Sequence, residues 1–560
     1  MFTFLASAGL GVSLLAATGT HILVSDFEGA NLSKEWRFAR CEVTLVPGAG
    51  PNGESALRVV SAFPPDNPTC WVRRIYPQPI DASTTRALVF RLRGDPRGVA
   101  LTPHLLRLEQ DARANVREVA FPGPTIDAGF EGWRQFQVPL DAFVDLGAAD
   151  RRRLHVVNFS LTRRESPQAE VLLADIRLTD QPEGTIIGGA VPRVEDEAAL
   201  YALLAPPSPD GGEIARLAAA GRVDEARSRF VAYLEARARP RYFVDWRTRA
   251  ELMRALREHY PGTIEGHVRA ANQALARDFT FEGDRRQVGR PVQWLQGPVE
   301  WTHILSRFGY WRSLGVAWAA TGDEKYAREF VELLRDWVAH NPLPPRVTNS
   351  TGTRGNTWRT LEAGIRCEEW IRALFWFWDA DSFTPEDKAL LIRSLVEHAR
   401  YLHAHELATG FQYGNWQVVE CAGPAMVALL FPELREATQW RETAYRLLGE
   451  HLERDVHPDG AHHELTPGYH NWVAERLASV WLLAQKNDVP GPALPGNAGA
   501  EAFRAKLARM WEFNLAIIMP DGAMPAVGDA GRGSLRSQLA LGALLFQRPD
   551  FRSQGAELPP

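Results

Sequence analysis

Hydrophobic and polar residues follow two different periods along this chain. From about residue 20 to about residue 180 they alternate in short segments, such as residues 56–60, 87–92 and 133–138, with Gly, Pro, Asp and Asn between the segments. Alternation gives a strand one apolar and one polar face, and repeated short strands of this kind are typical of a sandwich. We therefore predict an all-β sandwich over residues 20–182.

The period changes after a connector that we place at residues 183–212. Apolar residues then recur at intervals of three and four, which is the spacing of a helix with one buried face. The clearest helical segments are residues 362–378, 385–403, 416–430, 440–455, 469–485 and 502–518. Many antiparallel helices in one domain form either a solenoid or an α/α toroid. Because the sequence shows no fixed internal repeat, it favours a toroid over residues 213–550.

Composition narrows the class of protein and of partner. A chain of 560 residues predicts roughly two to four domains. Its 45% hydrophobic and 23% charged residues fall in the range of soluble globular proteins. The formal net charge of −5 argues against a broad basic surface. Nucleic acid is therefore not an expected partner, and an acidic substrate would need a local cluster of Arg and Lys.

The first residues predict export. Residues 1–19 are almost wholly apolar or small and end in Ala17-Thr18-Gly19, which suits a cleaved signal peptide and a secreted or periplasmic protein. No later apolar run approaches the ~20 residues that a membrane helix needs, so we expect no membrane association. In an oxidising compartment Cys41 and Cys70, which share one predicted domain, are free to form a disulfide.

Two polar motifs carry the candidate chemistry. Residues 413–420 (YGNWQVVE) contain Asn415, and residues 464–470 (ELTPGYH) contain Tyr469. Thr466-Pro467 is a helix-start signal, and Gly414-Asn415 directly precede an apolar run. We therefore expect both polar side chains at helix N-termini, where free N–H groups meet solvent. An amide there can hold a carboxyl group while a phenol removes the proton beside it.

The helical half resembles the heparinase II/III and alginate lyase group of polysaccharide lyases. The order and spacing of several stretches carry the resemblance, namely the two polar motifs, WTHILSRFGYW at 301–311, TGDEKY at 321–326, WRTLE at 358–362 and PAVGD at 525–529. The resemblance implies an incomplete α/α toroid and β-elimination on a uronic-acid-containing glycan. It implies that Tyr469 is the base and acid, and that Asn415 neutralises the carboxyl group. We expect no cofactor.

The sequence departs from that family pattern in two ways. Relatives commonly carry a C-terminal β-sheet domain that supplies a His, whereas this sequence ends at Pro560, about where that domain should begin. Either the sequence is truncated or the enzyme works from the helical domain alone. Many relatives also have His near Gln417. We therefore predict Gln417 as a second amide donor to the carboxyl group, and His463 or His470 as the group that takes over proton transfer.

Other side chains are predicted to bind the acidic polysaccharide. Arginine pairs with carboxylates, and tryptophan stacks on sugar rings. The residues expected at the substrate are Arg307, Arg354, Trp358, Arg359, Arg366, Trp416, Glu420, His463, Glu464 and Trp472. The first and last predicted strands of the N-terminal region resemble those of jelly-roll carbohydrate-binding modules. The alternative for that region is a structural sandwich that binds no sugar.

Three rival readings follow from the same residues. A toroid can house a hydrolase with two carboxylates, here Glu420 with Glu464 or Asp459. The chain can also be a non-catalytic polysaccharide-binding protein. The remaining reading is a metal site, for which His457, His462, His463 and Glu464 are the only sequence cluster. Because adjacent histidines do not easily present both rings to one ion, we predict no metal there.

Overall fold

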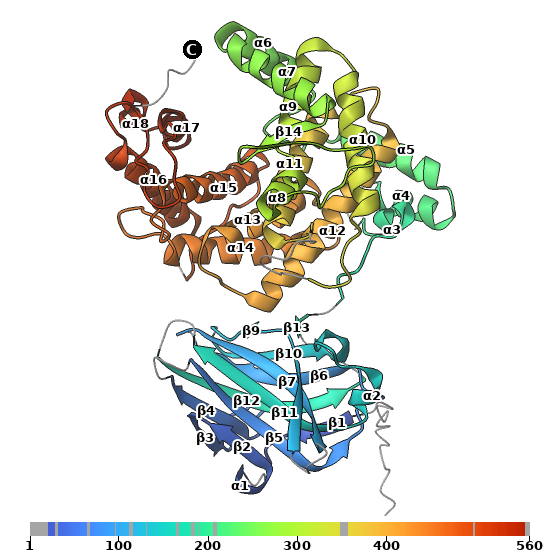
Figure 1. The fold of residues 1–560 in the computed structure, drawn as a ribbon, viewed down its shortest axis with the longest axis vertical. Coiled ribbons are helices and arrows are strands. Elements are labelled where there is room, and N and C mark those ends of the chain that lie inside the picture. Colours follow the sequence, from blue (N-terminus) through green and yellow to red (C-terminus); the bar gives the residue numbers. More distant parts are fainter. Residues whose placement is uncertain are drawn as a thin grey trace, which may run out of the picture. The chain divides into compact units, whose positions relative to one another are not determined.

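A computed structural model gives the fold, and the chain forms two compact units, Met1–Gly189 and Ala190–Pro560 (Figure 1). The structure describes residues 21–28, 32–63, 68–95, 97–110, 116–129, 131–163, 167–180, 185–188, 190–204, 210–347, 357–496 and 499–554. The predicted signal peptide and Arg354 lie outside these residues. In the described part, no helix has both the length and the apolar character to cross a bilayer.

The first unit is all-β, as the alternating pattern predicts. Its strands are β1 His21–Ser25, β2 Trp36–Ala39, β3 Cys41–Val46, β4 Ala56–Ala62, β5 Thr69–Ile80, β6 Ala87–Arg93, β7 Val99–Gln110, β8 Val116–Pro122, β9 Ile126–Asp127, β10 Trp133–Pro139, β11 Leu154–Arg163, β12 Gln168–Thr179 and β13 Thr185–Ile186. Short helices α1 (Leu32–Glu35) and α2 (Ala148–Arg151) join some of them.

Two sheets make up this unit. One has the order β13-β10-β6-β12-β4-β3, with β1 also paired to β12, and the other has the order β2-β5-β11-β7-β8, with β9 paired to β7. The strands pair antiparallel, and β13 joins β10 in parallel. Phe90 of β6 meets Phe159 of β11 edge to face, with ring centroids 5.1 Å apart. The apolar faces of the two sheets therefore share one core, which confirms the all-β prediction.

Cys41 and Cys70 lie close together in this unit as free thiols. A hydrogen bond between the two thiols raises the pKa of Cys41 and lowers the pKa of Cys70. Their disulfide stays a prediction.

The second unit is helical, as the change of period predicts. Its helices are α3 Glu197–Tyr201, α4 Gly211–Ala219, α5 Val223–Ala236, α6 Arg249–His259, α7 Pro261–Leu275, α8 Val299–Arg307, α9 Trp311–Thr321, α10 Lys325–His340, α11 Thr360–Phe377, α12 Pro385–Thr409, α13 Asn415–Leu430, α14 Ala437–Arg454, α15 Pro467–Lys486, α16 Gly499–Ile517, α17 Arg536–Phe546 and α18 Pro549–Gln554. A hairpin of β14 (Asp278–Phe281) and β15 (Asp284–Gln287) precedes α8. Helix α3 lies inside the segment that the sequence treats as a connector.

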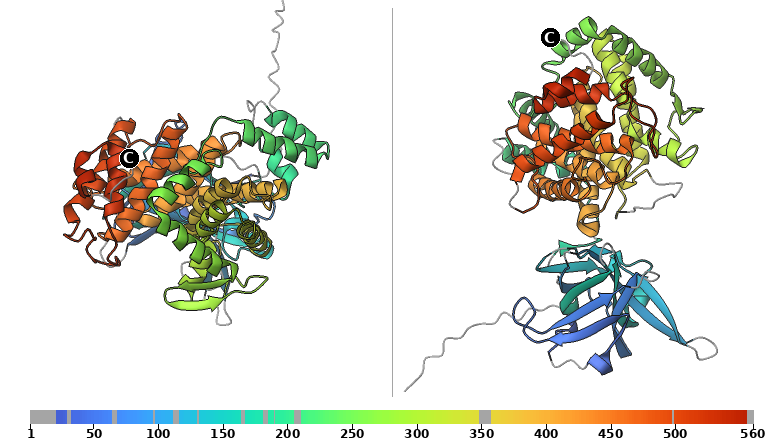
Figure 2. Two further views of the ribbon diagram at one scale, coloured as in Figure 1. Left: turned by 90° about the horizontal axis from the view of Figure 1, so that it is seen from above. Right: turned by 90° about the vertical axis from the view of Figure 1, so that its left-hand side faces the viewer.

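The helices of this unit pack in two rows. Helices α7, α9, α11, α13 and α15 contact one another in that order, and α10, α12, α14 and α16 form a second row behind them. The last helices, α16 to α18, continue side by side from α15 (Figure 2). Since the chain crosses to the second row and back between successive members of the first, α11, α13 and α15 run in the same direction. Their N-terminal ends therefore lie at one side of the unit.

Candidate active site

Asn415 begins helix α13 and holds a carboxylate. Its backbone N–H donates to Oε1 of Glu464 at 2.7 Å, and its side-chain Nδ2 lies 3.0 and 2.9 Å from the two carboxylate oxygens. Gly414 adopts φ 103°, and a Cβ there would lie 2.7 Å from the Glu464 carboxylate. Glycine is therefore required before Asn415. The start of α13 binds an anion through its free N–H group and the positive end of its dipole.

Tyr469 lies in the first turn of α15, which begins at Pro467 as the sequence predicts. The Thr466 hydroxyl does not cap the helix but donates to the carbonyl oxygen of Glu464 at 3.3 Å. The Tyr469 phenol is partly exposed and donates to Oδ2 of Asp529 at 3.3 Å. Partial burial, followed by the charge of Asp529, raises the pKa of Tyr469. Tyr469 is therefore protonated at neutral pH in this arrangement.

Two arginines and two carboxylates form a charged cluster near these helix starts, consisting of Glu300, Arg307, Arg359 and Glu362. Arg307 lies 2.6 Å from Glu300 and 2.9 Å from Glu362, and Arg359 lies 2.5 Å from Glu362. A hydrogen bond from His303, together with the arginines, lowers the pKa of Glu300 to about 2. The charge of Glu300 also contributes to the raised pKa of Tyr469, which places the cluster within electrostatic range of the phenol.

Aromatic surface lies beside this charged cluster. Trp416 and Trp472 are partly buried against the apolar side chains of Leu361, Ile365 and Val419. The Arg359 guanidinium lies 4.8 Å from the ring centre of Trp416. A cation, an amide, a phenol and two partly exposed aromatic rings thus lie at or near the starts of α11, α13 and α15. Such a combination suits an acidic sugar.

The family model described as Heparinase II/III N-terminus matches residues 200–549, which is more than half of the chain. The chain belongs to the heparinase II/III family. Similar curated proteins are a heparin-sulfate lyase of Pedobacter heparinus, 27% identical over 43% of this chain, and one of Bacteroides thetaiotaomicron, 26% identical over 35% of this chain. These alignments span only 35% and 28% of the two relatives.

Solved structures of the heparinase II/III family share this fold. A heparinase III structure has a TM-score of 0.52 at 18% identity and covers 64% of this chain and 55% of its own. A heparinase III gene product with methylated lysines has a TM-score of 0.50 at 22% identity and covers 65% of this chain and 57% of its own. At these identities the likeness concerns the fold.

Gln417 and His470 are buried in this heparinase II/III family member, and their catalytic roles stay predictions. The Gln417 amide donates to the Gly410 carbonyl oxygen, while its oxygen accepts from the Gln412 N–H at 2.7 Å and lies 2.9 Å from a His451 nitrogen. The His470 ring lies 3.0 Å from the Met510 carbonyl oxygen, and burial lowers its pKa to about 4. Both side chains hydrogen-bond to backbone groups of neighbouring segments.

Three predicted substrate contacts also belong to the core. Arg366 is 0% exposed and donates to His398 at 2.8 Å, and burial lowers its pKa to about 10. Trp358 is buried and donates to the Asn341 carbonyl oxygen at 3.0 Å. Glu420 is 2% exposed and lies 3.5 Å from His405. These residues support the packing of α11 to α13, and their contact with substrate stays a prediction.

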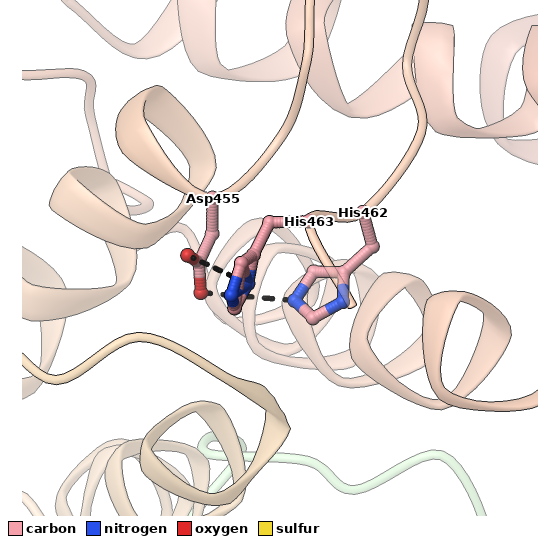
Figure 3. A group of neighbouring side chains, drawn as sticks. All are labelled: Asp455, His462 and His463. Atoms are coloured by element: carbon pink, nitrogen blue, oxygen red, sulfur yellow. Dashed lines mark ion pairs between the residues drawn. The ribbon is translucent and has the colours of Figure 1, made fainter. Parts of the chain in front are cut away.

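The structure brings other predicted residues together. Asn415, Glu464, Trp416, Arg359 and Arg307 surround the helix starts described above. His463 is half-buried, with its ring centre 5.2 Å from that of Tyr413 and its Nδ1 3.4 Å from Asp455. Its neighbour His462 also points toward Asp455 (Figure 3). Both adjacent rings therefore face one carboxylate, which contradicts the geometric argument made from sequence.

Sequence reasoning missed several carboxylates of the candidate site. Glu300, Glu362 and Asp529 lie within or next to the matched motifs at 301–311, 358–362 and 525–529, which offered a signal. Asp455 and His451 lie outside these motifs, so no sequence motif pointed to them. Only the fold brings them to the site.

Proposed function

We propose that the protein is a polysaccharide lyase that cleaves a uronic-acid-containing glycan, of the glycosaminoglycan class, by β-elimination. Membership of the heparinase II/III family and the heparin-sulfate lyases among its relatives support this activity. The observation that carries the proposal is the pairing of Asn415 and Tyr469 at neighbouring helix starts, with a carboxylate already held by Asn415.

Asn415 acts on the carboxyl group of the sugar. Removal of the C5 proton turns this carboxylate into an enediolate with more negative charge on its oxygens. Amide and backbone N–H donors that are already in place stabilise such charge without reorganisation. The contacts with Glu464 support this role, because they show that the Asn415 amide binds a carboxylate. Nδ2 carries two hydrogens, so one can stay on Glu464 while the other turns to the substrate.

Tyr469 moves the proton. As phenolate it takes the proton from C5, the C4–O bond then breaks to leave a C4=C5 double bond, and the phenol returns the proton to the departing glycosidic oxygen. A tyrosine with an ordinary pKa near 10 needs a lowering of about 2 units, or roughly 3 kcal/mol, to act near neutral pH. In this proposal Arg307 and Arg359, the cations of the charged cluster, supply stabilisation once substrate separates the phenol from Asp529.

The wider architecture supports a chain-like substrate. In this proposal the two rows of helices form the incomplete α/α toroid, and the starts of α11, α13 and α15 lie on the substrate side. The protein is exported to the periplasm or the exterior, where acidic polysaccharides are met. The N-terminal sandwich assists as a carbohydrate-binding module.

The paired-carboxylate hydrolase is not favoured. A hydrolase needs both carboxyl groups beside one glycosidic bond. Glu420 is buried beside His405, while Asp459 is exposed in the turn before His462.

One experiment separates the proposed classes. The purified chain is incubated with heparan sulfate, heparin, chondroitin sulfate and alginate, and the products are examined by mass spectrometry and ultraviolet absorbance. A lyase gives new ends that carry an unsaturated uronate. New ends that have gained a water molecule would show that the protein is a hydrolase and not a lyase. Binding of a glycan without cleavage would show that it is a binding protein.

A further inference from the structure

We propose that Asp455, His462 and His463 bind one divalent transition-metal ion, with Zn²⁺ the best match. The three side chains offer ligand atoms that all lie within 4.8 Å of one another, the one such group found in the described part of the chain (Figure 3). This site goes beyond the proposed lyase chemistry, since no step of that chemistry uses a metal.

The backbone brings the three residues together without the ion. Asp455 ends helix α14, and the chain turns back through Gly460, which has φ 93°. An isolated bridge pairs Val456 with His462, and the N–H of His463 donates to the carbonyl oxygen of Asp455 at 2.8 Å. We call residues 455–463 the metal hairpin. Because its register is fixed by backbone bonds, the ligands are held before a metal arrives.

The spacing of the ligand atoms suits a metal ion better than direct hydrogen bonds. His462 Nε2 lies 3.7 Å from Oδ2 of Asp455, and His463 Nδ1 lies 3.4 Å from Oδ1 of the same carboxylate. Bonds of ~2.0–2.2 Å to a tetrahedral zinc ion separate its ligand atoms by about 3.3–3.6 Å. The distances between these atoms in the structure are therefore close to those between ligand atoms around a tetrahedral zinc ion.

The ligand atoms also lack other partners. Among the described residues, no hydrogen bond reaches either ring nitrogen of His462, Nδ1 of His463 or Oδ1 of Asp455, although these atoms are buried. Buried polar atoms without partners are costly, and an ion would satisfy them together. The other oxygen of Asp455 accepts from the Gly414 N–H and lies beside His451, both at 2.9 Å. Metal ligands in proteins are usually oriented by such outer contacts.

The donor set selects the class of metal. Two imidazoles and one carboxylate suit zinc and its transition-metal neighbours, whereas Ca²⁺ and Mg²⁺ prefer oxygen ligands. The His463 side chain is 37% exposed, so one side of the site is open to a water ligand. The ion would tie the end of α14 to the segment that carries Glu464 and, through Gly414, to the start of α13. It would act as a positioning element for Asn415.

Zinc content and thermal stability test the site without any substrate. Bound metal is first removed from tag-free full-length protein with a chelator, and the protein is then dialysed against Zn²⁺. Inductively coupled plasma mass spectrometry measures the zinc content, and Co²⁺ replaces Zn²⁺ where a visible absorption spectrum is wanted. The wild type should retain one ion per chain, and zinc at a hundred times its dissociation constant should raise the melting temperature by about 3 °C. His463→Ala, a change at a half-buried side chain, should lose the ion and the shift.

His457→Ala is the matched control, because His457 is exposed in the same hairpin and is not a proposed ligand. It should bind zinc as the wild type does. Circular dichroism checks that both variants are folded. Absence of bound zinc in the folded wild type, or equal binding by the His463→Ala variant, would overturn the site. A protein that binds zinc but cleaves no glycan would keep the site and remove the proposed lyase function.

Discussion

The starts of helices α11, α13 and α15 and the interiors of the same helices use similar polar residues in different ways. At the starts, Arg359, Asn415 and Tyr469 each contact a carboxylate, namely Glu362, Glu464 and Asp529. In the interiors, Arg366 contacts the imidazole of His398, and His470 contacts a carbonyl oxygen. The carboxylates at the starts lie beside free N–H groups and the positive dipole ends, whereas an interior carboxylate such as Glu368 is paired with an arginine, Arg476, at 3.1 Å.

The largest expected effect separates start from interior on one helix. Asn415→Ala removes the amide from the start of α13 and should lower kcat for β-elimination by about 10²–10³-fold, the usual loss for one oxyanion donor. Glu420→Gln, five residues further along α13, should leave kcat unchanged because Glu420 is buried. Steady-state kinetics on the best glycan measures both. A loss of kcat in Glu420→Gln but not in Asn415→Ala would show that Glu420 takes part in the chemistry, as the hydrolase reading requires.

The Glu362→Ala variant tests whether the carboxylate of Glu362 stabilises the start of α11. Glu362→Ala leaves Arg359 and Arg307 without a buried partner and should lower the free energy of unfolding by about 3 kcal/mol. Urea titration of the helical unit measures this change. Arg222→Ala, which breaks an exposed pair with Glu225, is the control and should change nothing measurable. Equal losses of unfolding free energy in the two variants would show that burial of the charged cluster does not stabilise the fold.

Two tryptophans sharpen the comparison for sugar binding. Trp416→Ala removes a partly exposed ring at the start of α13 and should raise KM about fivefold, equivalent to ~1 kcal/mol of stacking. Trp358→Ala removes a buried ring and should instead lower the melting temperature, because it opens a cavity. Steady-state kinetics and thermal melts of both variants measure the changes in KM and in melting temperature. A KM effect from Trp358→Ala in folded protein would contradict its assignment to the core.

The smallest effect concerns pH. Burial and the charge of Asp529 raise the pKa of Tyr469, and the base must lose its proton to act, so kcat/KM should rise with pH toward the alkaline side. Asp529→Asn removes an anion beside the phenol and lowers its pKa. The rising limb of the pH profile should therefore move to lower pH. A limb that stays in place would mean that Asp529 does not act on the base.

Much of this arrangement could be predicted from local sequence, and the rest depends on distant contacts. Thr466-Pro467 and Gly414-Asn415 mark the starts of α15 and α13 because a proline in the first turn and a glycine at positive φ are local requirements. Local sequence cannot tell Arg359, which pairs with Glu362, from Arg366, which contacts His398, since these partners depend on how the helices pack. The contact between Gln417 and His451 likewise joins residues 34 positions apart. The two adjacent histidines face one carboxylate because the metal hairpin turns at Gly460.

The most direct test of the account is the rate at which Tyr469→Phe forms unsaturated uronate ends. The variant keeps the ring and removes the base, so the rate should fall by about 10²–10⁴-fold while the melting temperature stays that of the wild type. Tyr413→Phe removes an exposed phenol from the segment before Asn415 and should retain the wild-type rate. Unchanged elimination by Tyr469→Phe, or an equal loss in Tyr413→Phe, would contradict the assignment of Tyr469 as the base.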